Sequence, residues 1–560
     1  MTETPIPVTQ PAAAQKPTAA KPQSVRAGGL IRSSMIYSGF TLVSRLVGFA
    51  RDLALTATMG ASATIAADAF NTALAFPNLF RRIFAEGAFA AAFVPSYARS
   101  LETDGEEVAD MLAADAMAVL AAATLALTVI AELTMPWLMY LIAPGFASNP
   151  AKFHLAIVLT QITMPYLPCM AIYAHLSGVL NARNRFILSA AAPILLNLWT
   201  LVTVLPAHSP VQAAEWGGIG VIIAGVTQAG LLWWGCKRSG AHVGFRWPRL
   251  TPAIKKLIML AVPGAIAASA TQINIFVSGI LVSHVNGART WLTVCDRLYQ
   301  LPQGLVGVAI GVALLPQLSR AASANDRQAT RAAMDQAIVF ALALCLPAAA
   351  ALTAIPFFLI DALYTRGEFT TGDAHQTAAA LMQYGWGVPA FVLAQIFTRA
   401  FFARQDTKTP MRLALITVGV NLALALTLYP LVGVPGIAAA TAAAWWLNVI
   451  MMAVTLHRTG HYTPGRRAVS KVLRILAASL AMGAILGLAS HYRGPIQQVL
   501  GPVSLHHPKE LAVVLVCGLG GGAYPFLLFA FGGLTLTEIK TAFRRRRGQK
   551  AEAVEDLSAS

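Results

Sequence analysis

The sequence predicts an all-α polytopic membrane protein with about fourteen transmembrane helices. Of its 560 residues, 56% are hydrophobic and only 12% are charged, and the mean hydropathy is +0.62. Soluble domains carry about 25% charged residues, so a soluble fold of this size could not cover its surface. Apolar stretches of about 20 residues or more, long enough to cross the hydrocarbon layer, recur along the chain.

The first 29 residues form a polar, Ala- and Pro-rich tail without a signal-peptide core, and we expect this tail to be disordered. Fourteen apolar spans follow it. They lie at 31–58, 65–97, 110–140, 153–180, 187–207, 214–236, 253–284, 288–318, 330–357, 376–403, 410–430, 434–457, 471–491 and 510–533. The second, fourth, eighth and tenth spans are overlong and contain Pro or Gly, which predicts kinks or extensions beyond the membrane.

The basic charge follows the loops between the spans. The chain has 41 Lys and Arg against 24 Asp and Glu, a net charge of +17. Loops after even-numbered spans hold 20 Lys and Arg, loops after odd-numbered spans hold five, and a run of four arginines follows at 544–547. This asymmetry is the positive-inside pattern, which predicts that both termini are cytoplasmic and argues against nucleic acid as a partner.

A weak internal repeat has a spacing of about 221 residues. Matched positions are Val94-Pro95 with Leu315-Pro316, Pro144-Gly145-Phe146 with Arg366-Gly367-Glu368-Phe369, and Ala182-Arg183-Asn184 with Ala403-Arg404-Gln405. Chance matches of short apolar motifs are the alternative. The repeat predicts two six-helix lobes in parallel pseudo-repeat, with a substrate site between them. The predicted domains are the tail at 1–29, an N-lobe at 30–240, a C-lobe at 241–460, an unrepeated helix pair at 461–535 and a basic cytoplasmic tail at 536–560.

Ionisable residues inside spans are functional candidates, because each costs about 2.5–3.5 kcal/mol to insert. In the first span, Arg45 and Asp52 are seven residues apart on one helix face and could pair, which leaves Arg51 without a local carboxylate. In the second span, Arg82 and Glu86 are spaced for an i,i+4 pair.

Arg81 in the second span and Arg297 in the eighth also lack a local partner. We therefore expect Arg51, Arg81 and Arg297 to line a common water-filled cavity. Guanidinium groups stay charged and donate paired hydrogen bonds, which suits a phosphate or pyrophosphate. An anionic substrate is predicted, and cationic drugs are disfavoured.

Several of these residues stand in longer motifs. They are Ser44-Arg45-x-x-Gly48-Phe49-x-Arg51-Asp52, Ala67-Asp68-Ala69-Phe70, Pro77-Asn78-Leu79-Phe80-Arg81-Arg82-x-Phe84-Ala85-Glu86-Gly87, and Asp296-Arg297-Leu298 with Pro302-x-Gly304-x-x-Gly307. The sequence thereby resembles the MurJ (MviN) family of lipid II flippases, in the MOP exporter superfamily, from about residue 31 to 535. The resemblance implies outward movement of undecaprenyl-pyrophosphate-linked peptidoglycan precursor across the bacterial cytoplasmic membrane by alternating access, for cell wall biosynthesis.

The resemblance also implies roles for individual residues. The substrate-binding residues would be Arg45, Arg51, Arg81 and Arg297. Supporting cavity residues would be Ser44, Asp52, Asp68, Asn78, Glu86 and Asp296. The last two spans would form a groove for the lipid tail, although the glycines at 518–522 could instead mark close helix packing.

The sequence leaves other functions open. A flippase for another polyprenyl-linked oligosaccharide and an ion-coupled small-molecule antiporter of the same superfamily are the nearest alternatives. An enzyme is disfavoured, because the outer loops are short and HExxH, Walker A and GxSxG motifs are absent. No catalytic residue, cofactor or metal site is expected. The seventh and eleventh spans lack the carboxylates that bind sodium in some family members. Expected partners are lipid II, membrane lipids and the cell wall synthesis machinery.

Overall fold

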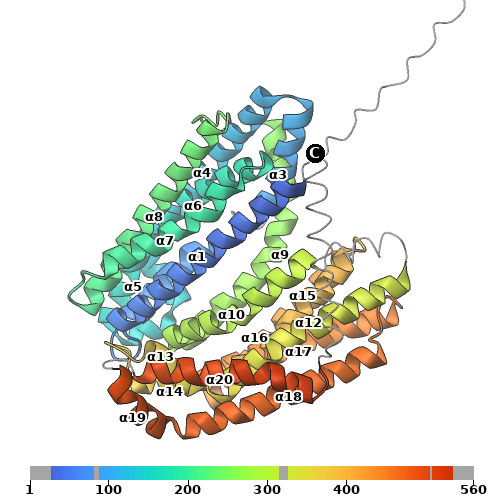
Figure 1. Cartoon of the computed structure of the whole chain (residues 1–560). Coiled ribbons are helices and arrows are strands. Elements are labelled where there is room, and N and C mark those ends of the chain that lie inside the picture. Colours follow the sequence, from blue (N-terminus) through green and yellow to red (C-terminus); the bar gives the residue numbers. More distant parts are fainter. Residues whose placement is uncertain (1–26, 81–87, 314–325, 505–507, 534–560) are drawn as a thin grey trace, which may run out of the picture.

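The computed structural model describes residues 27–80, 88–313, 326–504 and 508–533, and all regular structure in these ranges is helical (Figure 1). The predicted all-α class is therefore confirmed. The helices form two groups whose axes diverge from one common end, as Figure 1 shows.

The first helical group covers the N-terminal part of the chain. It consists of α1 (Ala27–Met59), α2 (Ala66–Phe80), α3 (Ala88–Thr103), α4 (Glu106–Ile142), the short 3₁₀-helix η2 (Pro144–Ser148), α5 (Pro150–Thr163), α6 (Tyr166–Ala182), α7 (Phe186–Val204) and α8 (Pro210–Arg238). Helix α7 packs along both α1 and α8. Small residues make close packing possible here: a Cβ at Gly217 of α8 would lie 3.1 Å from the Phe70 ring of α2.

The second helical group covers the C-terminal part. It consists of α10 (Ala288–Ala313), α12 (Arg327–Ala354), α13 (Pro356–Tyr364), α14 (Thr371–Gly385), α15 (Val388–Phe402), α16 (Lys408–Val432), α17 (Val434–Arg458), α18 (Arg466–His491), α19 (Arg493–Ser504) and α20 (Pro508–Ala530). Helix α9 (Pro252–Val282) lies between the groups and packs against α3 of the first and α16 of the second.

Within the described residues, ten helical segments are long and apolar enough to cross a membrane by length and composition. The remaining predicted spans coincide with α1, with α2 and α3, with α9 and with α10, which are helical but do not fall among those ten. A multi-pass membrane protein is confirmed, and the count of fourteen spans stays a prediction.

Two of the four predicted irregular spans are interrupted near their middle. The fourth breaks between α5 and α6 at Met164 and Pro165, and the tenth breaks between α14 and α15 at Trp386 and Gly387. Proline has no N–H to continue the hydrogen-bond ladder. A Cβ at Gly387 would lie 2.8 Å from the Ala442 methyl group, so the second break lets α15 approach α17 closely.

The backbone itself repeats at the predicted spacing. Asn184 (φ 59°) and Gln405 (φ 60°), which are 221 residues apart, are the non-glycine residues with positive φ in the described part of the chain. Such a conformation is uncommon for a residue with a Cβ. Its occurrence just after α6 and just after α15 supports the repeat more strongly than the letter matches do.

The two groups touch at one end, here called the closed end, formed by residues 57–73, 143–152, 283–291 and 364–373. The Gly145 N–H donates to Ser283 Oγ at 3.0 Å, and the Glu368 N–H donates to the Ala57 carbonyl at 2.9 Å. Gly367 has φ 55°, and a Cβ there would collide with the same carbonyl, so this approach requires glycine. The opposite ends of the groups diverge (Figure 1).

Candidate functional site: an arginine–carboxylate cluster between the two groups

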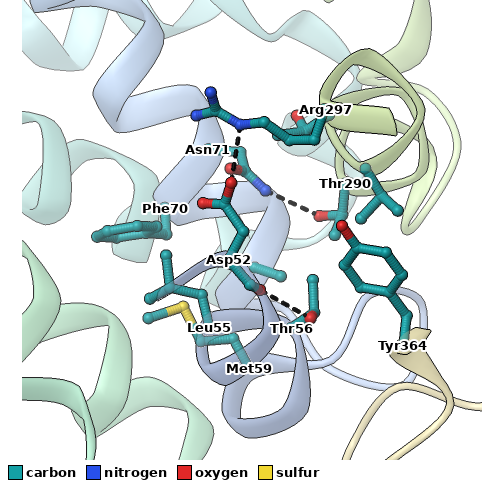
Figure 2. A pocket seen from close by; sticks show the side chains of 12 residues that line it. Asp52, Leu55, Thr56, Met59, Phe70, Asn71, Thr290, Arg297 and Tyr364 are labelled. Atoms are coloured by element: carbon teal, nitrogen blue, oxygen red, sulfur yellow. Dashed lines mark hydrogen bonds and ion pairs between the residues drawn. The ribbon is translucent and has the colours of Figure 1, made fainter. Parts of the chain in front are cut away.

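One carboxylate joins two guanidinium groups from different parts of the fold. Asp52 Oδ1 on α1 lies 2.6 Å from Nη2 of its neighbour Arg51. Asp52 Oδ2 lies 2.9 Å from Nε of Arg297 on α10, as Figure 2 shows. The side chains of Arg51 and Asp52 are 12% and 15% exposed, whereas Arg297 is 45% exposed. Asp52 therefore holds both arginines in place while Arg297 keeps donors free.

A small cavity of about 40 Å³ lies beside this cluster. Its walls come from α1, α2, α10 and the end of α13, including Asp52, Thr56, Phe70, Asn71, Thr290, Arg297 and Tyr364 (Figure 2). Asn71 Nδ2 donates to Thr290 Oγ1 at 3.2 Å, which is a further polar contact between the groups. The space suits one or two waters and is far too small for a lipid head group.

Arg45 lies on the same helix and is exposed. Its guanidinium packs against Gly304 on α10, at a place where a Cβ would push the guanidinium aside. Glycine at 304 thus allows a cation from the first group to lie directly on the second. Together, Arg45, Arg51 and Arg297 supply three guanidinium groups and Asp52 one carboxylate.

The other supporting residues lie in different surroundings. Ser44 accepts a hydrogen bond from Asn197 Nδ2 at its carbonyl, at 2.9 Å, which fixes α1 against α7. Asp296 accepts from the Gln300 amide one turn along α10. Asn78 is half-buried on α2. Arg81, Arg82 and Glu86 lie outside the described residues.

The expectation that Arg51 and Arg297 lack a carboxylate partner is wrong. The prediction considered only ion pairs between residues three, four or seven positions apart on one helix. The long Arg51 side chain instead folds back onto its neighbour Asp52, and the partner of Arg297 comes from another helix. Asp52 was expected to face Arg45, but its ion pairs are with Arg51 and Arg297.

Asp68 lies at the closed end and not among the residues that line the cavity beside Asp52. Its two oxygens accept from Lys152 Nζ at 2.8 Å, the Gly287 N–H at 2.7 Å, and the Thr290 N–H and hydroxyl at 3.1 and 2.8 Å. Asp68 and Lys152 are each 1% exposed. Asp68 of the first group thereby accepts from N–H groups at the start of α10 in the second group, and so joins the two groups at the closed end.

Two further cations, Lys152 and Arg289, belong to predicted loops but lie inside the folded protein. Lys152 is buried beside Asp68 and over the Phe146 ring, at 4.3 Å from its centre. Arg289 lines a cavity of about 30 Å³ with Phe76 and Gln272, and its guanidinium packs against Gly279. The one available signal for Lys152 was Asp68, an acid within a predicted span that needed a partner.

Solved structures share the architecture of this chain. A multidrug resistance MATE family transporter of the MOP superfamily, in an inward-facing conformation, superposes with a TM-score of 0.62 at 14% identity, covering 76% of this chain and 97% of that one. This likeness shows the fold alone: that of a MOP-superfamily transporter.

The family is shown by closer matches. A family model described as "Lipid II flippase MurJ" matches residues 55–500. The probable lipid II flippase MurJ of Rhizobium meliloti (strain 1021) is 38% identical over 537 residues, 94% of this chain and 98% of that protein. The lipid II flippase MurJ of Burkholderia cenocepacia is 31% identical over 535 residues, 93% of this chain and 100% of that protein. A structure titled "Lipid II flippase MurJ, inward closed conformation" gives a TM-score of 0.70 at 25% identity, covering 86% of this chain and 98% of that one. The chain belongs to the MurJ family.

Proposed function

We propose that this protein is a flippase that moves lipid II, the undecaprenyl-pyrophosphate-linked peptidoglycan precursor, from the inner to the outer leaflet of the bacterial cytoplasmic membrane. Family membership supports the substrate, and the Asp52–Arg297 ion pair between two helical groups supports the site. The protein acts as a transporter and not as an enzyme. Surrounding membrane lipids and the cell wall synthesis machinery are its other proposed partners.

The arginines are proposed to bind the pyrophosphate. Arg51 and Arg297 are already held close together by a shared anion, the Asp52 carboxylate. A pyrophosphate carries more negative charge and more acceptor oxygens than one carboxylate, and guanidinium groups bind phosphates in a paired geometry. The substrate would therefore compete with Asp52 for Arg297, while Arg45 and Arg81 would complete the site.

Competition of this kind would couple binding to movement. The Asp52–Arg297 bond joins α1 to α10, so a ligand that replaces it changes the contact between the groups. A ligand shifts a conformational equilibrium only by binding one state more tightly than the other. The cavity beside Asp52 is too small for the head group, so binding requires the groups to separate there.

The charge asymmetry of the loops supports a membrane orientation. Both termini are proposed to be cytoplasmic, which places the closed end on the extracytoplasmic side and the diverging ends on the cytoplasmic side. This state would receive substrate from the inner leaflet. Release outside would then require the Asp68–Lys152 network to open.

The proposed domain organisation is that of two six-helix lobes, at 30–240 and 241–460, with a helix pair at 461–535 that holds the lipid tail. A Cβ at Gly518, Gly521 or Gly522 of α20 would meet nothing within 4 Å. Gly520 alone among these four packs closely, with its Cβ position 2.8 Å from Leu486 of α18. The bare backbone around Gly521 offers an apolar track for a polyprenyl chain.

Purified protein in liposomes tests the function directly. Fluorescent lipid II placed in one leaflet should reach the other leaflet faster with the wild-type protein than with Arg297→Ala. Equal rates at equal protein content would contradict the proposal.

A further inference from the structure

A basic hollow lies outside the region between the two groups. It has a volume of about 490 Å³ and sits where α18 begins and α20 ends. Its walls are Pro464, Arg466, Val469, Ser470, Leu473, Arg474, Ala477 and Phe531. None of these described wall residues is acidic, so the hollow combines two arginines with apolar walls.

Polar and apolar residues form two parallel stripes on α18. Arg466, Ser470 and Arg474 follow one another at four-residue intervals and so share one face of the helix. The two arginines are about 12 Å apart along the axis at 1.5 Å per residue. Val469, Leu473 and Ala477 form a second stripe about 60° around the helix and slightly further from its start.

Arg474 is held in position by the end of α20. Its Nη1 donates to the Gly532 carbonyl at 3.2 Å. Gly532 has φ 69°, a conformation that lets the chain turn back toward α18. The guanidinium group still has other N–H donors, and its side chain is exposed.

The apolar stripe is open to the surroundings. Leu473 is 60% exposed, and Val469 and Phe531 are each 44% exposed. Residues 466–474 contain four cations and no acid, so the local charge favours an anion. Basic pockets between transmembrane helices on the cytoplasmic side are suited to anionic lipid head groups.

We propose that this hollow binds an anionic glycerophospholipid of the inner leaflet, with its phosphate between Arg466 and Arg474 and an acyl chain along the Val469, Leu473 and Ala477 stripe. The assignment to the inner leaflet rests on the membrane orientation given under the proposed function. The chain's own C-terminal segment is a poor occupant, because residues 534–560 hold six Lys and Arg against four Asp and Glu, and this net positive charge is repelled by a basic hollow.

The test compares two double variants of the full-length protein by native mass spectrometry in detergent. Arg466→Gln with Arg474→Gln removes both cations of the hollow. Arg467→Gln with Arg458→Gln removes two exposed cations that do not line it and serves as the matched control. Each protein is titrated with dioleoyl-phosphatidylglycerol and with the zwitterionic dioleoyl-phosphatidylcholine.

The wild-type and control proteins should retain phosphatidylglycerol in preference to phosphatidylcholine. The hollow variant should bind it roughly tenfold or more weakly, since a basic residue near an anionic lipid contributes about 1 kcal/mol. Equal loss in the control would mean general surface attraction, and no loss in the hollow variant would mean no site. Either result overturns the proposal.

Lipid II separates this inference from the proposed function. Lipid II binding should survive in the hollow variant and fall in Arg297→Ala. If lipid II displaces phosphatidylglycerol one for one from the wild-type protein, and this displacement is not seen with the hollow variant, then lipid II is the occupant of the hollow. That result would overturn the phospholipid assignment.

Discussion

Arg297 of α10 donates through Nε to Asp52 Oδ2 of α1 at 2.9 Å, which joins the two helical groups through one carboxylate that also binds Arg51. Asp52 is only 15% exposed, so removing a cationic partner leaves a largely buried charge less well compensated. The two residues therefore have different expected roles, one in binding substrate and one in holding the empty site together.

Asp52→Asn is expected to separate binding from transport. Without the competing carboxylate, purified protein should bind lipid II at least as tightly as the wild type, while flipping slows by roughly tenfold or more because the empty site no longer closes around Arg297. Binding in detergent and flipping in liposomes check this. Asp115→Asn, which breaks an about equally exposed pair with Arg246 outside the site, is the control. Clearly weaker lipid II binding would mean that Asp52 orients the arginines for the substrate.

Arg81 and Arg82 are adjacent but are predicted to differ. Arg81→Ala should abolish complementation of a depleted strain at normal protein level, because Arg81 is assigned to the pyrophosphate. Arg82→Ala should lower the amount of protein, because it leaves Glu86 without its predicted partner. Immunoblots alongside complementation measure both effects. If the two variants behave alike, the division of this pair is wrong.

The Asp68–Lys152 pair should hold the closed end shut. Lys152→Met leaves the buried Asp68 carboxylate with fewer hydrogen-bond donors. Breaking a buried ion pair in this way destabilises the structure by about 3–5 kcal/mol, which would shift the equilibrium between a closed and an open end by a hundredfold or more. Spin labels are placed at Ala63 and Val285 in a background without native cysteines. Double electron–electron resonance should then give longer distances between the labels in Lys152→Met than in the unmutated background.

The controls for this prediction lie at the same end. Lys509→Met breaks a more exposed ion pair with Asp361 and should leave the distances unchanged. Adding Asp68→Asn to Lys152→Met should restore part of the short-distance population, because neither buried charge then remains. An unaltered distance distribution in Lys152→Met would show that the pair is not what closes this end.

Much of the fold could be predicted from hydropathy, because each apolar stretch must bury or shield its backbone within one helix. The breaks at Pro165 and Gly387, and the left-handed Asn184 and Gln405, also fall where the repeat and the interior Pro and Gly placed irregularities. The site was less predictable. Lys152 is 84 residues from Asp68, and no spacing rule for one helix could have joined them.

Neighbouring glycines of α20 offer a matched test of the proposed lipid-tail track. Gly521→Trp adds bulk where no atom lies within 4 Å, so the protein should fold normally but flip lipid II several-fold more slowly. Gly520→Trp would collide with Leu486 and should lower thermal stability. Thermal unfolding and liposome flipping distinguish the two effects. Normal flipping by Gly521→Trp, or by a protein that lacks residues 468–560, would refute the track.

The leaflet distribution of lipid II in cells depleted of this protein tests the central claim most directly. On depletion, lipid II should accumulate in the inner leaflet. Wild-type protein should restore its outward movement, whereas Arg297→Ala should not, and Arg297→Lys should do so poorly because it lacks the guanidinium fork. An unchanged leaflet distribution after depletion, or full restoration by Arg297→Ala at equal protein level, would contradict the account.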